Sequence, residues 1–258
     1  MFIENLIIAS LAVFIHLTVF FIISIYKKNN NVIDIAWGAG FIFIALLSLC
    51  LNENFQIRQI IVTSLIVLWS ARLTSHIYIR MKQGRTSNRY GRLRKNFGEM
   101  SITKKMCYAF VFQLLVLLLM IYPVLFINSL QNPPLKYTDF IGLALWLIGF
   151  FFETISDYQL SNFLKRSENE NKILKKGLWK FTRHPNYFGE TLMWWGLFIF
   201  ATSLPGGWIT IVGPLTITYM LFFVSGIPLI EKKFKNHPEY QEYKKTTSAF
   251  IPWLSKKT

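Results

Sequence analysis

The residues best suited to chemistry lie in one short stretch, from Lys176 to Glu190. It reads Lys-Gly-Leu-Trp-Lys-Phe-Thr-Arg-His-Pro-Asn-Tyr-Phe-Gly-Glu, and an apolar run over 191–202 follows it. Pro185 suits the first position of a helix, where its missing N–H costs nothing. A helix start offers free N–H groups and the positive end of the helix dipole, which favour anions. Five side chains would surround this predicted anion site: Arg183, His184, Asn186, Tyr187 and Glu190.

The elements that must position this stretch are membrane-spanning helices. Of the 258 residues 53% are hydrophobic and 16% are charged, whereas soluble domains carry about 25% charged residues. Apolar runs such as 111–126 and 209–230 recur, and runs of about 20 apolar residues span a bilayer. The composition predicts an all-α, polytopic membrane helix bundle that forms a single domain over residues 1–258.

Net charge and cysteine content exclude several other classes of protein. A net charge of +15 would suggest a nucleic-acid partner in a soluble protein. Here the excess of Lys and Arg in cytosolic loops of membrane proteins accounts for most of it, so we expect no nucleic acid. Cys50 and Cys107 give neither a disulfide framework nor the spacing of metal ligands, so we expect no metal.

The charge of the loops predicts how the chain crosses the membrane. Seven spans fit, near residues 3–26, 33–51, 57–80, 106–128, 138–162, 187–203 and 208–230. With these spans, 25 of the 28 Lys and Arg residues fall in loops on one side. The positive-inside rule then puts the N-terminus outside and the C-terminus in the cytosol. We expect a multi-pass protein of the cell (inner) membrane whose site faces the cytosol.

Polar residues also mark the ends of the second and third spans. Asp34 lies about one turn inside the second span, where a carboxylate is costly and is either functional or a helix-capping acid. Arg72, His76 and Arg80 are spaced i, i+4, i+8 and therefore share one face of the third span. Arg72 is deep enough to need a partner, and Asp34 is a plausible one.

Two further segments could contact a ligand. Glu153 and Asp157 are one turn apart near the end of the fifth span, where they could bind ribose hydroxyls or adenine amino groups, pair with basic residues, or simply be solvated. The loop over 83–92 contains Arg85, Arg89 and Tyr90 among Gly, Ser and Thr. It could bind phosphate, or it could be an ordinary basic cytosolic loop.

The string over 183–190, with Asp157 upstream and Tyr240 and Tyr243 downstream, resembles the C-terminal half of membrane-bound steroid 5-alpha-reductases. The whole chain resembles still more closely a branch of that superfamily known only as a domain of unknown function. Isoprenylcysteine carboxyl methyltransferases, which bind S-adenosylmethionine, share the string.

The resemblance implies a seven-helix reductase that binds NADPH from the cytosolic side and reduces a carbon–carbon double bond in a lipophilic enone. It implies that Asn186 and Glu190 contact the cofactor, that Asp157 is an acidic contact and that Arg85 meets phosphate. The predicted cofactor-binding residues are Arg85, Arg89, Asp157, Arg183, His184, Asn186, Tyr187 and Glu190. The enolate that develops during reduction needs a donor, and Asp34, His76 or Tyr90 would supply it.

Two alternatives remain. The first is an S-adenosylmethionine-dependent membrane methyltransferase, because Glu153 stands where the steroid reductases have an Asn and a sulfonium favours acidic partners. The second is a lipid-binding or transport protein, although the polar residues cluster at cytosolic helix ends rather than at mid-membrane. In each case the expected partners are a lipophilic small molecule and the bilayer, with no obligatory protein partner.

Overall fold

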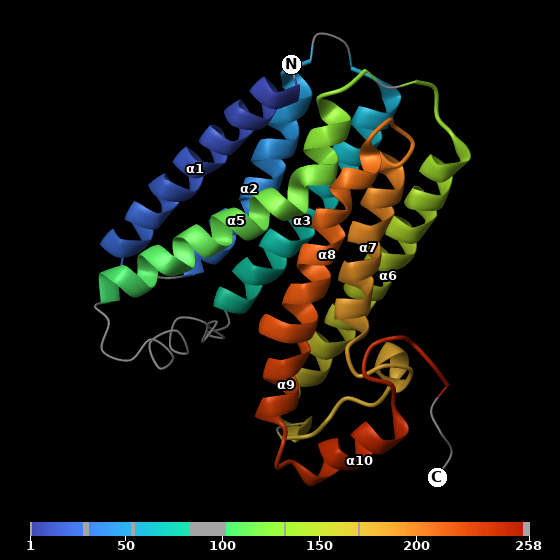
Figure 1. Ribbon diagram of the computed structural model, residues 1–258. Coiled ribbons are helices and arrows are strands. Elements are labelled where there is room, and N and C mark those ends of the chain that lie inside the picture. The colour runs from blue at the N-terminus through green and yellow to red at the C-terminus, as the bar shows by residue number, and fades with distance from the viewer. Residues whose placement is uncertain are drawn as a thin grey trace. The chain divides into compact units, whose positions relative to one another are not determined.

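The computed structural model describes residues 2–27, 31–52, 55–82, 102–131, 133–169 and 171–254 (Figure 1). Within these ranges the regular structure is helical and contains no strand; Thr182 and Ser248 form an isolated β-bridge. Six stretches are long and apolar enough to cross a membrane: Ile3–Tyr26, Val32–Cys50, Ile57–Lys82, Phe110–Asn128, Tyr137–Lys165 and Gly207–Lys233. The prediction of an all-α membrane protein is therefore confirmed.

The chain divides into two compact units. One comprises Met1–Leu135 with Leu204–Thr210, and the other comprises Lys136–Ser203 with Ile211–Thr258. Each unit has its own packed helices. A single domain over residues 1–258 stays a prediction.

Among its described residues, the first unit contains four long helices: α1 (Phe2–Tyr26), α2 (Asn31–Cys50), α3 (Ile57–Lys82) and α5 (Ile102–Asn128). α2 packs against each of the other three. Its Phe41 ring meets Trp69 of α3 edge to face, with the ring centroids 5.2 Å apart. The buried Asn128 side chain donates to Ser48 Oγ (2.9 Å) and Thr63 Oγ1 (3.1 Å). An apolar, aromatic core with a few polar side chains that hydrogen-bond between helices is typical of a helix bundle in a bilayer.

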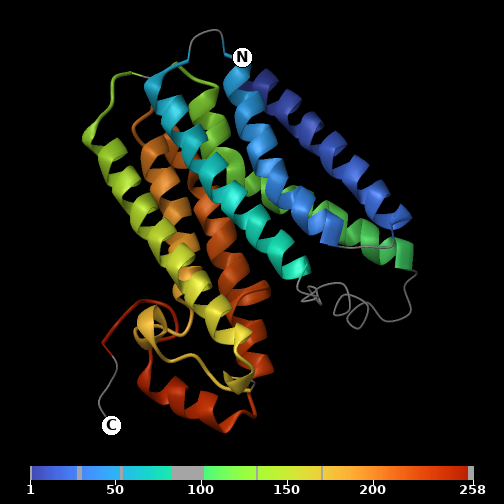
Figure 2. The ribbon, with the colours of Figure 1, turned by 180° about the vertical axis from the view of Figure 1, so that it is seen from behind.

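In the second unit, α6 (Tyr137–Lys165) and α7 (Pro185–Ala201) run antiparallel and side by side (Figures 1 and 2). At the start of α6, the Asp139 carboxylate accepts the backbone N–H of Lys136 at 2.6 Å. It also accepts the hydroxyl of Ser203, just beyond α7, at 2.9 Å. One acid thus caps α6 and ties it to the end of α7.

α7 corresponds to the predicted span over 187–203. Its 17 residues extend about 26 Å at 1.5 Å per residue, whereas a hydrocarbon core is about 30 Å thick. The helix is also shorter than each of the six apolar stretches, which have 19 to 29 residues. The count of seven spans and the orientation stay predictions.

The rest of the second unit is an interrupted helix and a short helix after it. α8 (Val212–Tyr219) continues into a π-helical turn over Met220–Val224, and α9 (Ile227–Lys233) follows. The interruption falls at Gly226, where an added Cβ would lie 2.8 Å from Leu221 Cα. After α9 the chain turns into α10 (Pro238–Thr246) (Figure 2).

Candidate functional site

The start of α7 lies where the sequence predicts it. The helix begins at Pro185, with His184 in the N-cap position and without a side-chain cap. The backbone N–H of Phe188 donates to the carbonyl of His184 at 3.0 Å, which closes the first turn. The earlier N–H groups of the helix have no such intrahelical partner, so this end carries the positive partial charge that favours anions.

Pairs of glycines bring α6 and α7 together. Gly142 on α6 faces Gly196 on α7, and Gly149 on α6 faces Gly189 on α7. Within each helix the two glycines are seven positions apart. A Cβ added to Gly196 would lie 2.7 Å from the carbonyl oxygen of Gly142, and one added to Gly189 would lie 2.5 Å from the backbone nitrogen of Glu153. Small residues at such crossings let the two backbones touch, which fixes the register of the helices.

This register places an amide beside a carboxylate. Asn186 Nδ2, in the first turn of α7, donates to Asp157 Oδ1 of α6 at 3.3 Å. The amide oxygen of Asn186 is buried and accepts no hydrogen bond from the residues that the structure describes. Glu190 follows Asn186 by one turn on α7, and the buried Glu153 precedes Asp157 by one turn on α6. The α6–α7 pair therefore gathers three of the predicted cofactor-binding residues and leaves one acceptor unused.

A second cluster at the same helix end centres on Glu231 of α9. Arg183, which is only 7% exposed, approaches Glu231 Oε1 through Nη2 at 2.9 Å. Arg183 Nη1 also donates to the backbone carbonyls of Lys244 (3.0 Å) and Thr247 (3.3 Å). The guanidinium therefore joins the start of α7 to α9 and to the end of α10.

The Glu231 carboxylate receives two further donors from α10. Lys244 Nζ lies 2.6 Å from Oε2, and the Tyr240 hydroxyl donates to Oε1 at 3.0 Å. The Tyr243 hydroxyl donates to the carbonyls of Trp179 and Thr182. Burial raises the pKa of Tyr240 and of Tyr243, so both hydroxyls stay protonated and keep donating at neutral pH.

His184 is neutral in this cluster. It is 2% exposed, and burial lowers the pKa of its imidazole to about 4 although Glu231 opposes the shift. Its Nε2 lies 3.8 Å from Glu231 Oε1, a distance that would count as an ion pair for a protonated ring. Because burial outweighs the attraction of one carboxylate, this contact is not a salt bridge at neutral pH. The ring stacks on Tyr187 with 5.4 Å between centroids.

Of the three arginines predicted to bind phosphate, the structure describes only Arg183. Arg183 is already held by Glu231 and two carbonyls, so a phosphate would have to compete with them. Arg85 and Arg89 lie outside the described residues, as does Tyr90, one of the three predicted proton donors.

The other two predicted donors belong to the first unit. Asp34 is buried near the start of α2, and His76 is half-buried near the end of α3. Their roles, and a pocket that combines them with α6 and α7, stay predictions. Within the described ranges, no group of three or more His, Cys, Asp or Glu side chains is placed to hold a metal ion.

Sequence reasoning missed Glu231. Nothing in its local pattern separates this residue from its charged neighbours as a partner for a buried arginine. The signal that could have found it is indirect. An arginine as deeply placed as Arg183 needs a carboxylate partner, and the chain has only 13 acidic residues to supply one.

Comparison with known proteins identifies the family of this chain. A family described as "Protein of unknown function (DUF1295)" matches residues 20–247. The chain belongs to this family. The family is related to steroid 5-alpha-reductases and isoprenylcysteine methyltransferases, which confirms the resemblance predicted from the sequence.

Three proteins that are similar to part of this chain are named after an enzyme activity. 3-Oxo-5-alpha-steroid 4-dehydrogenase 1 of Rattus norvegicus is 30% identical over 115 residues, which is 44% of this chain and 40% of that protein. Very-long-chain enoyl-CoA reductase of Dictyostelium discoideum is 30% identical over 134 residues, covering 50% and 42%. Protein-S-isoprenylcysteine O-methyltransferase of Saccharomyces cerevisiae is 25% identical over 131 residues, covering 46% and 51%.

The chain thus spans about two fifths of the length of the two reductase relatives and about half of the methyltransferase. No solved structure matches the chain. The three relatives are named as enzymes, and the apolar helices support an integral membrane protein.

Proposed function

We propose that this protein is an NADPH-dependent membrane reductase of a carbon–carbon double bond in a lipophilic enone of steroid, sterol or isoprenoid type. The observation that carries the proposal is the Asp157–Asn186 pair at the glycine-packed end of α6 and α7, with its unused amide oxygen. Similarity to proteins named as a steroid dehydrogenase and an enoyl-CoA reductase supports the same chemistry.

The residues at this helix end fit parts of a dinucleotide. The Asn186 amide oxygen can accept the N–H of a carboxamide, and the carboxylates of Asp157 and Glu190 can accept ribose hydroxyls. The positive end of α7 favours phosphate, with Arg85 and Arg89 as the proposed cationic ligands. NADPH, when bound, supplies the hydride that reduces the β carbon of the enone.

The chain itself must bind the cofactor, stabilise the enolate and exclude water. We assign the proton for the α carbon to Asp34, His76 or Tyr90. A preorganised donor in a site without water is worth far more than one in solution. The bilayer supplies the lipophilic substrate, and we place the site on the cytosolic side of the cell membrane because the basic loops cluster there.

The experiment is a ligand titration of the purified protein in detergent, followed by thermal unfolding. NADPH at about 100 times its dissociation constant should stabilise the protein by about 2.7 kcal/mol. Glu190→Ala should remove this stabilisation while the protein still inserts. Stabilisation by S-adenosylmethionine and none by NADPH would overturn the proposal.

A methyltransferase is the second candidate, and one specific observation favours it. Glu153 is one turn from Asp157 on α6 and Glu190 is one turn from Asn186 on α7, so three carboxylates accompany the Asp157–Asn186 contact, whereas Arg183 pairs with Glu231. A positive sulfonium with a small amino-acid moiety suits acidic partners better than a phosphate does. The same titration distinguishes the two cofactors. A protein that binds neither would be a lipid-binding or transport protein.

A further inference from the structure

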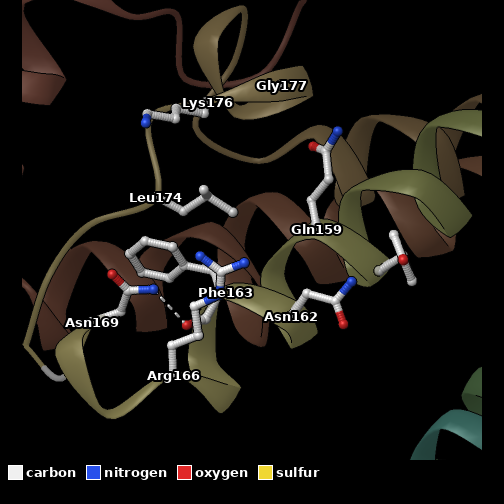
Figure 3. A pocket seen from close by; sticks show the side chains of 9 residues that line it. Gln159, Asn162, Phe163, Arg166, Asn169, Leu174, Lys176 and Gly177 are labelled. Carbon is white, nitrogen blue, oxygen red and sulfur yellow. Dashed lines mark hydrogen bonds between the residues drawn. The ribbon is translucent and has the colours of Figure 1, made fainter.

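A pocket of about 310 Å³ lies beside the last turns of α6, where the chain folds back through residues 166–177 (Figure 3). Phe163 of α6 and Leu174 of the returning loop provide apolar surface. Arg166 and Lys176 bring two cations to it. All of its lining residues belong to the second unit.

The pocket is on a different side of α6 from the candidate cofactor site. Tyr158 and Asn162 line it and are one turn apart, so they share one face of α6. At 3.6 residues per turn, residue 162 is turned by roughly 140° from residue 157. Asp157 is the residue that meets Asn186. The function proposed for the α6–α7 site therefore does not use this pocket.

The walls of the pocket are already held in place. Gln159 accepts the backbone N–H of Leu178 at 3.0 Å, and Asn169 donates to the carbonyl of Phe163 at 2.9 Å, as Figure 3 shows for Asn169. Both amides thus pin the returning loop to α6. A ligand would therefore meet walls that are already in place rather than having to order them.

A bilayer-spanning α6 would place the pocket at the depth of lipid headgroups. α6 has 29 residues, which extend about 44 Å. That length matches the 40–45 Å of a bilayer with its headgroup regions, whereas the hydrocarbon core is about 30 Å thick. A stripe of apolar side chains, each more than half exposed, runs along α6 and ends at the pocket: Phe140, Leu147, Phe151 and Tyr158. An acyl chain on this stripe would lead its headgroup to Arg166 and Lys176.

The charge of the pocket favours an anion. The ion pair between Arg166 and Glu168 is long, at 3.7 Å, and its side chains are 73% and 67% exposed, so it holds Arg166 only weakly. None of the described lining residues is acidic. Two cations beside an apolar wall complement a group with a phosphate at one end and a hydrocarbon at the other.

We propose that this pocket binds the phosphate headgroup of an anionic glycerophospholipid whose acyl chains lie along the exposed stripe of α6. Arg166 and Lys176 contact the phosphate, and Phe163 and Leu174 contact the glycerol backbone. The bound lipid anchors the end of α6 and the returning loop at the membrane surface.

The test measures binding of fluorescent phosphatidylglycerol and phosphatidylcholine to the full chain in detergent. Phosphatidylglycerol should bind at least tenfold more tightly. Arg166→Gln with Lys176→Gln should weaken its binding about thirtyfold, since two cations near an anionic surface are worth that much together. Asn162→Trp, which fills the pocket and keeps its charge, should also weaken binding.

The matched control is Lys172→Gln with Lys180→Gln, which removes one exposed cation of the returning loop and one just beyond it, neither of which lines the pocket. Its binding should change less than threefold. An equal loss in the control would mean that general charge, and not the pocket, attracts the lipid. Glycerol phosphate without acyl chains and NADPH should both fail to displace the lipid, and displacement by either would overturn the proposal.

Discussion

Two clusters of polar side chains meet at the start of α7, and they differ in how many of their oxygen acceptors are used. In one, Glu231 accepts Arg183, Lys244 and Tyr240, and the Arg183 guanidinium also reaches two carbonyls. In this Glu231 cluster the buried atoms without a hydrogen-bond partner among the described residues are two nitrogens, Arg183 Nε and His184 Nε2. In the other, Asn186 donates a single 3.3 Å bond to Asp157 and keeps a buried oxygen that accepts nothing from the described residues.

The difference distinguishes a cluster that holds the fold together from a pair of side chains that can bind a ligand. A carboxylate whose two oxygens both accept hydrogen bonds has no acceptor left for a ligand, and removing it from a buried ion pair is strongly destabilising. A buried acceptor without a partner costs stability, so a ligand that donates a hydrogen bond to it would gain binding free energy. We therefore read the Glu231 cluster as the clamp that holds α10 against the 179–183 segment, and the Asp157–Asn186 pair as the binding side. Four predictions test this comparison, from the largest expected effect to the smallest.

Glu231→Gln should cause the largest loss, about 3–5 kcal/mol, because it leaves the buried Arg183 guanidinium without a compensating charge. Thermal unfolding in detergent measures it. The matched control is Glu168→Gln, whose partner Arg166 is 73% exposed. The control should change stability by less than about 1 kcal/mol. Equal effects of the two substitutions would show that the Glu231 cluster is not a clamp.

Acid should destabilise the same cluster. The pKa of His184 in the folded protein is about 4, below the value of about 6.5 for an unfolded chain. Between these values the unfolded state binds more protons, so stability falls as the pH drops from about 6.5 towards 4. The loss should reach about 3 kcal/mol at pH 4. Unfolding followed across this range measures it.

His184→Asn removes the titrating group and should flatten this part of the pH profile. An unchanged slope in His184→Asn would assign the acid sensitivity to other groups. His237→Asn serves as the control, because His237 is the N-cap of α10, outside the Glu231 cluster, and its Nε2 lies 2.7 Å from the carbonyl oxygen of Asn171. An equal flattening in His237→Asn would show that the effect is not specific to His184.

Gly189→Ala should cost about 1–3 kcal/mol, because the new methyl group would lie 2.5 Å from the backbone nitrogen of Glu153 and the two helices would have to separate. The separation should also break the Asp157–Asn186 pair and weaken cofactor binding. Gly40→Ala is the matched control, since there the nearest atom is the end of the Leu117 side chain at 3.0 Å, which can move. Unchanged cofactor binding in Gly189→Ala would mean that the register of α6 and α7 does not set the site.

The sequence predicted the parts of this arrangement that depend on local pattern. Hydropathy placed the long helices, and Pro185 placed the start of α7, because both signals act within a few residues. Asn186 and Glu190 follow from that start as neighbours on one face. The link to Asp157 needed the glycine crossing, which depends on how two helices pack.

The Glu231 cluster could not be predicted from local sequence pattern. Arg183 and Glu231 are 48 positions apart in the sequence, and their contact depends on where α9 and α10 pack. The interruption before α9 is different, because Gly226 and Pro228 are local signals that predict a break, and Pro228 lies in the first turn of α9. Tertiary packing decided the Arg183–Glu231 contact, whereas local sequence placed the break.

The smallest effect on stability should come from the pair that matters most for binding. Asn186→Ala removes one 3.3 Å hydrogen bond and an unused acceptor, so stability should change by less than about 1 kcal/mol. Stabilisation by NADPH should nevertheless disappear. Gln241→Ala is the matched control, because it removes an exposed amide that donates to the carbonyl of Lys235 in the C-terminal region. If Asn186→Ala kept its cofactor stabilisation, or lost as much stability as Glu231→Gln, then the two clusters would have the same structural role and the start of α7 would not be the binding side.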